Sequence, residues 1–330
     1  VESIGNGAFA STKLENVEIP AQLSYLGTSV FSDCTSLTRV SIKANITSIP
    51  NGCFQGCSSL SSVEYPASVT VIGESAFSGC GFTSFKLNGN VTEIQREAFS
   101  SCKNLENMEW GNVSLIGFNA FEDCGFKELS LPASLCDIYM NAFAYCKNLV
   151  KVDLSKTNVK EIGCFANCYA LEEVRFPQNL TGIGYECFKG CSSIVTLNLP
   201  SSLLTLSGKD FLGMSSLTEI NLSNTKIKGI SDACFKDCSS LQKVVFPKSL
   251  ESINNSAFEN ATALKQVDLS NTTVHNISTS SFAGCRSLEQ VSLAENTDTI
   301  GNLAFSGCSN LAEVRNTNHV KIVFDGAFEG

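Results

Sequence analysis

The chain has 330 residues, of which 43% are hydrophobic and 17% charged, with a formal net charge of −9 at pH 7. A chain this long and this apolar can bury a large core, which argues against disorder. Its acidic balance argues against nucleic acid and anionic membranes as partners, and no apolar run approaches the roughly 18–20 residues of a membrane-spanning helix.

Phenylalanine recurs along the whole chain at intervals of 22 to 24 residues, which is typical of stacked repeat proteins. No insertion interrupts this period, so we predict a single domain over residues 1–330, with about fourteen to fifteen repeats. The chain opens and stops inside a repeat, which indicates a piece of a longer protein truncated at both ends. The fifteen registers are Phe9, Phe31, Phe54, Phe77, Phe99, Phe121, Phe143, Phe165, Phe188, Phe211, Phe235, Phe258, Phe282, Phe305 and Phe328.

Each repeat contains the same elements in the same order. Five residues before the Phe lies an aliphatic residue in all repeats but one, and three residues after it lies Cys in eleven repeats. Apolar residues that are three apart, such as Phe143, Cys146 and Leu149, indicate one face of a short helical turn. The pattern then changes to period two at Val152 and Leu154, which is the spacing of a strand.

Proline marks the end of the strand in many repeats. Six of the seven prolines directly follow the alternating pair, where a residue without an N–H ends strand pairing. Because one such unit cannot bury its apolar side alone, stacked neighbours must share the core. The sequence therefore predicts an α/β solenoid that is right-handed, with parallel strands on one face and short helical or 3-10 turns on the other.

The pattern Ile-Gly-x-x-Ala-Phe-x-x-Cys-x-x-Leu-x-x-Val-x-Leu-Pro, nearly whole in residues 72–80 and 183–200, resembles the BspA-like leucine-rich repeats of the Treponema pallidum type. The resemblance covers essentially the whole chain. It implies a leucine-rich-repeat solenoid, secreted or surface-anchored in bacteria or parasitic protists, that adheres to host matrix or to other cells. Departures from the pattern are local: Asp210 replaces the small residue before Phe211, and two repeats, at Gly81-Phe82 and Gly125-Phe126, lose one residue before the strand.

Fifteen of the sixteen cysteines occupy two positions of the repeat, either three residues after the Phe or directly before it. Both positions face inward by their spacing, where Cys behaves as a small hydrophobe. There is no Cys-x-x-Cys, and His275 and His319 are far from any paired-ligand spacing. We therefore predict free core thiols, with no disulfide and no metal site.

Signals for catalysis are absent from the sequence. It contains no G-x-S-x-G elbow, no phosphate-binding G-x-x-x-x-G-K-[ST] loop and no G-x-G-x-x-G fingerprint. Glycines at Gly5, Gly73, Gly117, Gly184 and Gly301 recur at one register, which favours a role in corners. We expect no enzymatic activity and no cofactor.

The outward strand positions, which we call the strand face, are the remaining candidate for function. Charge is densest between residues 107 and 175, and we predict a ligand-binding patch there. The alternative is a solvated sheet face on which charges alternate, since exposed ion pairs contribute only about 0–1 kcal/mol. The candidate patch consists of Glu109, Glu128, Lys151, Asp153, Glu173 and Arg175.

The function that we predict is protein binding by a monomer that is secreted or displayed on a cell surface, with its signal or lipid anchor outside this chain. The partner would be a host extracellular-matrix or surface protein. One alternative is a structural stalk that presents another domain. Carbohydrate binding is a weaker alternative, because the sequence shows no stripe of exposed aromatic residues and places Tyr65 and Trp110 at inward positions.

Overall fold

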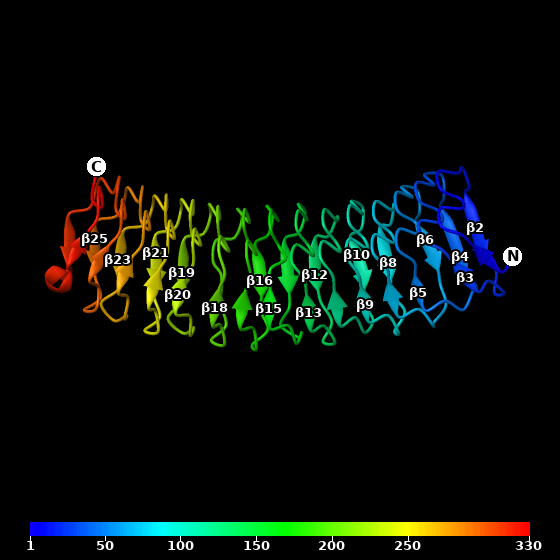
Figure 1. Ribbon diagram of the computed structural model, residues 1–330, viewed down its shortest axis with the longest axis horizontal. Coiled ribbons are helices and arrows are strands. Elements are labelled where there is room, and N and C mark those ends of the chain that lie inside the picture. Colours follow the sequence, from blue (N-terminus) through cyan, green and yellow to red (C-terminus); the bar gives the residue numbers. More distant parts are fainter. The chain divides into compact units, whose positions relative to one another are not determined.

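A computed structural model describes all residues, 1–330, as two compact units. Unit 1 comprises Val1–Leu149 with Lys156–Val159, and unit 2 comprises Val150–Ser155 with Lys160–Gly330. In each unit the chain winds through stacked repeats, and nearly every turn of the coil contributes to two columns of parallel strands (Figure 1). The exception is the turn between residues 184 and 204, where Thr196 forms only an isolated bridge to Glu219. Each unit is thus a parallel-strand solenoid of the leucine-rich-repeat type with almost no helix.

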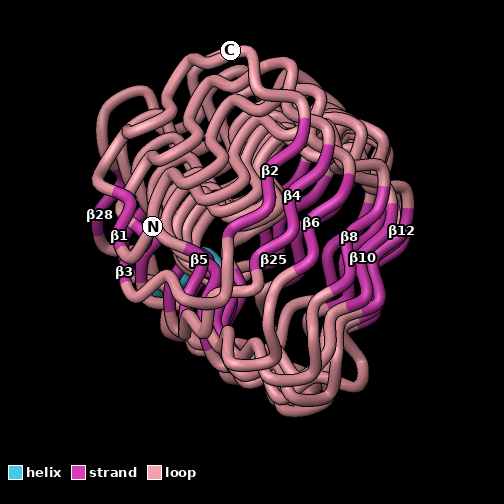
Figure 2. The backbone as a smooth tube through the Cα atoms, turned by 90° about the vertical axis from the view of Figure 1, so that its right-hand side faces the viewer, coloured by secondary structure: helices cyan, strands magenta, loops and turns pink.

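The first column of unit 1 holds its longer strands and carries the strand face, and the second holds strands of two residues (Figure 2). The longer strands are β2 (Asn16–Ile19), β4 (Arg39–Ile42), β6 (Ser62–Glu64), β8 (Ser84–Lys86), β10 (Asn107–Glu109) and β12 (Glu128–Ser130). The short strands are β1 (Ser3–Ile4), β3 (Tyr25–Leu26), β5 (Ser48–Ile49), β7 (Val71–Ile72), β9 (Glu93–Ile94), β11 (Leu115–Ile116) and β13 (Asp137–Ile138).

Unit 2 repeats the same two columns, and its one helical element is the 3-10 turn η1 (Thr317–His319). The longer strands are β14 (Lys151–Asp153), β16 (Glu173–Arg175), β19 (Glu219–Asn221), β21 (Lys243–Val245), β23 (Gln266–Asp268), β25 (Gln290–Ser292) and β27 (Glu313–Arg315). The short strands are β15 (Glu161–Ile162), β17 (Gly182–Ile183), β18 (Thr205–Leu206), β20 (Gly229–Ile230), β22 (Ser252–Ile253), β24 (Asn276–Ile277), β26 (Thr299–Ile300) and β28 (Ile322–Val323).

The segments around each Phe, which we call turn segments, are hydrogen-bonded turns rather than the helical turns that the spacing predicts. The reason is where their N–H groups point. The Phe31 N–H donates to the Cys53 carbonyl of the next repeat at 2.8 Å, and the Ser29 and Asp33 N–H groups also donate to the next repeat. Both Ser29 and Asp33 have positive φ, 52° and 57°, which interrupts a right-handed helix. The N–H groups between them close turns within the repeat, as Ser32 does with the Ser29 carbonyl at 3.2 Å. Alternating bonds of these two kinds therefore take the place of continuous helical bonding.

The core of each unit is a column of stacked Phe rings flanked by aliphatic side chains. Phe31 and Phe54 lie 5.6 Å apart between ring centroids with planes 2° apart, and Phe121 and Phe143 are 5.4 Å apart at 4°. Phe143 is fully buried. Stacked repeats therefore cover the side chain that no single repeat could bury, as the sequence predicts.

The two shortened repeats interrupt the strand-face sheet of unit 1. The hydrogen-bonded strands are β2-β4-β6 and β8-β10, so the sheet breaks between β6 and β8, where the repeat carries Gly81-Phe82. A Cβ at Gly81 would lie 2.3 Å from the Ser58 carbonyl oxygen, and one at Gly125 would lie 2.4 Å from that of Lys103. Only glycine fits so close to the preceding repeat. Phe82 and Phe126, both 1% exposed, fill the place that Leu takes in the other repeats.

Candidate functional site on the strand face

The longer strands alternate as their spacing predicts, with the central residue inside and its neighbours outside. Leu129 and Val152 are 3% and 1% exposed, and Phe85 is 6% exposed. The flanking residues Glu128 and Lys151 are exposed. Successive repeats therefore present pairs of polar side chains in register on the strand face.

In unit 1 the strand face contains a hollow of about 360 Å³ over β8, β10 and β12. Its lining combines apolar side chains, which are Phe85, Met108, Trp110, Phe126 and Leu129, with polar ones, which include Lys86, Glu106, Asn107, Glu109, Glu128 and Ser130. The hollow lies where β10 and β12 are not hydrogen-bonded to each other, next to the second shortened repeat. An apolar floor with a polar rim is the composition of protein sites that bind ligands.

The two candidate residues of unit 1, Glu109 and Glu128, both line this hollow. A carboxylate oxygen of Glu109 lies 2.7 Å from Lys86 Nζ, and the two side chains are 69% and 74% exposed. Such an exposed pair contributes little to stability, so both charges are accessible to a partner. Glu128 is exposed at the opposite side of the hollow.

The four candidate residues of unit 2 lie abreast on the paired strands β14 and β16, with Lys151 opposite Glu173 and Asp153 opposite Arg175. Glu173 accepts a hydrogen bond from Arg175 Nε at 2.8 Å and lies 3.7 Å from Lys151 Nζ. Asp153 accepts hydrogen bonds from the backbone and hydroxyl of Ser155 at 2.8 and 2.6 Å. The structure therefore brings these four residues into one charged group.

A second hollow, of about 540 Å³, lies on the strand face of unit 2 over β21 and β23. It is lined by Lys243, Val245, Phe246, Gln266 and Asp268, among others, and these two strands are not hydrogen-bonded to each other. Charge density along the sequence does not single out this site, because charge is densest between residues 107 and 175. The break in strand pairing that opens the hollow has no signal in the repeat pattern.

The cysteine column has a role that its spacing alone does not reveal. In ten repeats the thiol lies within hydrogen-bonding distance of the carbonyl oxygen of the previous repeat's Phe, for example at 3.0 Å from Cys57 to Phe31 and 3.3 Å from Cys146 to Phe121. Burial raises the pKa of Cys57 and Cys146 to about 12, so each thiol keeps its proton and donates. None of the sixteen cysteines forms a disulfide, and fifteen are buried while Cys136 is exposed.

Asp210 is the one buried carboxyl of the core. It is 0% exposed, and neither of its side-chain oxygens has a hydrogen-bond partner. Burial raises the pKa of Asp210 to about 8, and the backbone of Ser207 partly opposes this rise. It lies in the column of residues directly before the Phe, between Cys187 and Cys234 of the adjacent repeats. No group of three or more His, Cys, Asp or Glu side chains is arranged to hold a metal ion.

Exposed aromatic side chains are present, but they lie outside the strand face, which was the only surface that the repeat pattern singled out. Trp110 is 8% exposed, as an inward position predicts, and Tyr65 is partly buried, with its hydroxyl accepting a hydrogen bond from the Asn88 N–H at 3.1 Å. By contrast, Phe118 and Tyr139 are 45% and 41% exposed. Both follow short strands of unit 1.

The model of the BspA-type leucine-rich-repeat region matches residues 1–106, 104–218 and 206–330, with six copies. The chain belongs to the BspA-type leucine-rich-repeat family. No curated protein matches the sequence of this BspA-type chain, and no helix in the structure is long and apolar enough to cross a membrane.

Solved structures of other repeat proteins are similar to this BspA-type chain. A leucine-rich-repeat protein from Bacteroides ovatus is 27% identical with a TM-score of 0.77, over 98% of this chain and 88% of that one. A leucine-rich cell surface protein from Faecalibacterium prausnitzii is 23% identical with a TM-score of 0.56, over 96% and 83%. The pneumococcal vaccine antigen PcpA is 18% identical with a TM-score of 0.51, over 93% and 78%. The latter two likenesses concern the fold.

Proposed function

We propose that this chain is a non-enzymatic protein-binding module of a secreted or cell-surface protein, and that it adheres to host or neighbouring-cell proteins through the strand face. The observation that carries the proposal is the hollow of unit 1, in which apolar side chains lie beneath a rim of exposed charges. The name of the Faecalibacterium prausnitzii relative, a cell surface protein, supports the location.

The shape and lining of the hollow favour a protein ligand. Binding energy at protein interfaces is concentrated in a few side chains that fill desolvated pockets. A volume of about 360 Å³ accommodates one or two large side chains of a partner rather than an extended surface. Phe85, Met108 and Trp110 would contact the apolar part of such an anchor, while Lys86 and Glu109 would contact its polar neighbours.

The charges of unit 2 would act on the rate and the specificity of association. Lys151, Glu173 and Arg175 are 40–64% exposed, so each stays hydrated and accessible. Exposed charges at an interface steer the approach of a complementary partner and add little to the affinity itself. We therefore assign Lys151, Asp153, Glu173 and Arg175 to partner selection.

The test is binding of purified extracellular-matrix proteins to the immobilised chain as a monomer, followed by a triple change, Glu109→Lys, Glu128→Lys and Glu173→Lys. Retention of the partner should fall, and in the unchanged chain the association rate should fall as salt concentration rises. A matched triple change, Glu161→Lys, Glu251→Lys and Glu295→Lys, alters the net charge equally at exposed positions outside the strand face and should leave retention unchanged.

Three other results of this binding test would contradict recognition through the strand face. Equal loss in both triple variants would mean that net charge, and not the strand face, attracts the partner. Survival of binding in the first variant would place recognition on the turn segments or the edges of the solenoid. If no partner is retained by the unchanged chain, a structural stalk replaces the binding module as the proposal.

A further inference from the structure

Three exposed apolar side chains lie next to one another in unit 1, where short strands end and turn segments begin. We call Phe118, Tyr139 and Met140 the ridge patch; they are 45%, 41% and 45% exposed. The rings of Phe118 and Tyr139 are 4.8 Å apart between centroids, with planes inclined at 32°. Grouped exposure of this kind marks interaction sites more often than single exposed apolar residues do.

The surroundings of the ridge patch are acidic. The register of β9, β11 and β13 places Glu93, Leu115 and Asp137 abreast. Asp137 precedes Tyr139 by two residues and therefore points to the same side, and it is exposed. The exposed carboxylate of Asp137 thus lies on the same side as the Tyr139 ring, whose face is electron-rich, and both features attract a cation.

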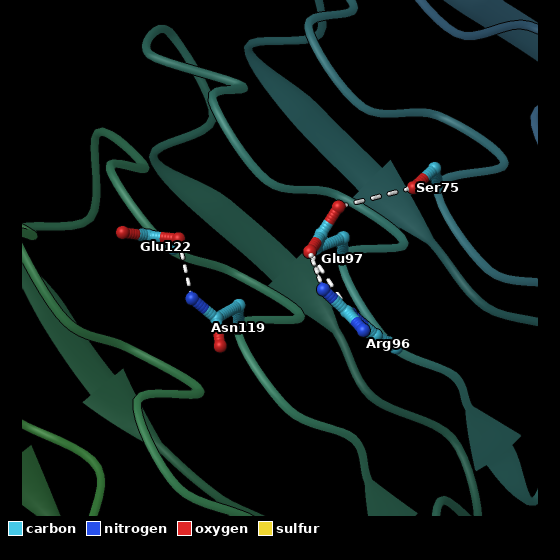
Figure 3. Close-up of polar contacts among 5 residues, drawn as sticks. All are labelled: Ser75, Arg96, Glu97, Asn119 and Glu122. Atoms are coloured by element: carbon cyan, nitrogen blue, oxygen red, sulfur yellow. Dashed lines mark hydrogen bonds and ion pairs between the residues drawn. The ribbon is translucent and has the colours of Figure 1, made fainter.

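The guanidinium next to the patch does not offset this charge. Figure 3 shows that Arg96 is bound to its neighbour Glu97, with Nε and Nη2 at 3.0 and 2.9 Å from one carboxylate oxygen. The other oxygen of Glu97 lies 3.4 Å from the Ser75 hydroxyl, and Glu74 also acts on the charge of Arg96. Arg96 and Glu97 together carry no net charge, so this pair does not offset the negative charges of Glu93 and Asp137.

In unit 2 a lysine lies over the aromatic ring that is equivalent to Phe118. Tyr185 stands three residues before Phe188, as Phe118 stands before Phe121. Lys209, two residues before the Phe of the next repeat, places Nζ 5.4 Å from the centroid of the Tyr185 ring. The same Nζ lies 3.7 Å from a carboxylate oxygen of Glu186. Ring and carboxylate together hold an ammonium group there.

Unit 1 lacks the residue that would do this. The position equivalent to Lys209 is Asn141, two residues before Phe143, and its amide carries no charge. We propose that the ridge patch binds a basic segment of a protein partner, whose lysine or arginine side chain takes the place over Phe118 and Tyr139 that Lys209 takes over Tyr185. This surface belongs to the short-strand column and is independent of the strand face.

The first test uses a dye-labelled peptide of eight lysines and measures its affinity for the full chain by fluorescence anisotropy. The double change Phe118→Ser and Tyr139→Ser leaves the net charge at −9, so unspecific attraction to an acidic protein is unaltered. Because each exposed ring contributes modestly to holding a cation, the affinity should fall about five- to thirty-fold. The control Tyr169→Ser, an exposed tyrosine of unit 2, should not change it.

The second test adds the missing cation. Asn141→Lys should weaken peptide binding, because the new ammonium competes for the same rings. Lysine fits this backbone, since Lys209 has φ of 57° where Asn141 has 60°. The control Ser256→Lys adds the same charge at the equivalent position of a repeat in unit 2, where φ is 55°, and should have a smaller effect.

Three results would overturn the proposal. One is an affinity that does not change in the Phe118→Ser, Tyr139→Ser variant while its melting curve shows that it is folded. A second is equal weakening by Asn141→Lys and Ser256→Lys, which would mean that net charge alone acts. The third is ring-dependent binding of a neutral oligosaccharide, such as maltohexaose, with no binding of the lysine peptide.

Discussion

The turn segments place nearly the same side chains at the same positions in every repeat, whereas the strand face places different ones. In a turn segment the Phe ring, the Cys thiol and three N–H groups all contact the adjacent repeats. On the strand face the side chains contact solvent and a few polar side chains of the same strand or of an adjacent repeat. The turn segments thus hold the repeats together, and the strand face is free to vary.

This difference separates stability from recognition in the two units. A change in a turn segment alters packing in three repeats at once, so it should change the free energy of unfolding. A change on the strand face alters hydrated groups, so it should affect binding alone. Four predictions test this separation, beginning with the largest effect.

Replacing Phe143 by Ala should lower the local free energy of unfolding by about 3–5 kcal/mol, through lost transfer energy and the cavity left behind. Phe328 is 43% exposed in the last repeat, against 0% for Phe143, so Phe328→Ala should cost much less. Denaturant unfolding of both variants checks this. Equal costs would contradict the stacking of repeats as the source of stability.

Replacing Asp210 by Ala should raise the free energy of unfolding by about 1–3 kcal/mol near pH 7.5, because a buried unpartnered polar group is removed. Its pKa in the native state is about 8 against 3.8 ordinarily. Between about pH 4 and pH 8 the native carboxyl therefore keeps a proton that the unfolded chain has already released.

Stability of the unchanged chain should accordingly fall as pH rises through that window, because the unfolded state binds fewer protons there. Urea unfolding at pH 5 and pH 7.5 measures the fall, which should be smaller in Asp210→Ala. Ser281→Ala, a change at the same position of another repeat, alters no titrating group and should keep the pH dependence. An unchanged slope in Asp210→Ala would show that other groups cause it.

Replacing Cys146 by Ala should cost about 1 kcal/mol, the usual contribution of one hydrogen bond, since it removes the bond to the Phe121 carbonyl. Ala261 already occupies this position in another repeat, so the variant should fold. Thiol titration should find sixteen groups in the denatured chain and about one, Cys136, in the native chain. A count near zero after denaturation would indicate disulfides.

The smallest effect on stability is expected from the strand face. Glu109→Lys, Glu128→Lys and Glu173→Lys should each shift the free energy of unfolding by about 0.5 kcal/mol or less, as exposed changes usually do. A melting curve of the triple variant measures this. A large loss of stability would mean that the exposed ion pairs of Glu109 and Glu173 hold the strands together.

The architecture was predictable because the Phe spacing is a long-range signal repeated fifteen times. The burial of Phe143 followed from the repeated Phe register, and the outward positions of Glu128 and Lys151 followed from alternation along the strands. The short-strand column was not predictable, because a strand of two residues such as β5 has no alternation to detect. The right hand of the coil stays a prediction.

The site was less accessible to sequence reasoning. Charge density selected Glu109 and Glu128, and the sequence shows the shortened repeat at Gly125-Phe126. It does not show that strand pairing breaks beside this repeat and that a hollow opens there. The partnering of exposed side chains is equally hidden: Tyr185 and Phe118 look alike in the sequence, and only the position of Lys209 distinguishes them. The role of Glu109, Glu128, Lys151, Asp153, Glu173 and Arg175 stays a proposal.

The two shortened repeats have an evolutionary consequence. The short strands β5-β7-β9-β11-β13 stay paired through both of them, and the rings from Phe54 to Phe121 stay stacked. Loss of one codon, together with Gly-Phe in place of the usual residues, is therefore absorbed on one side of the coil alone. Deletions of this size can therefore reshape the strand face while the short strands stay paired and the Phe rings stay stacked.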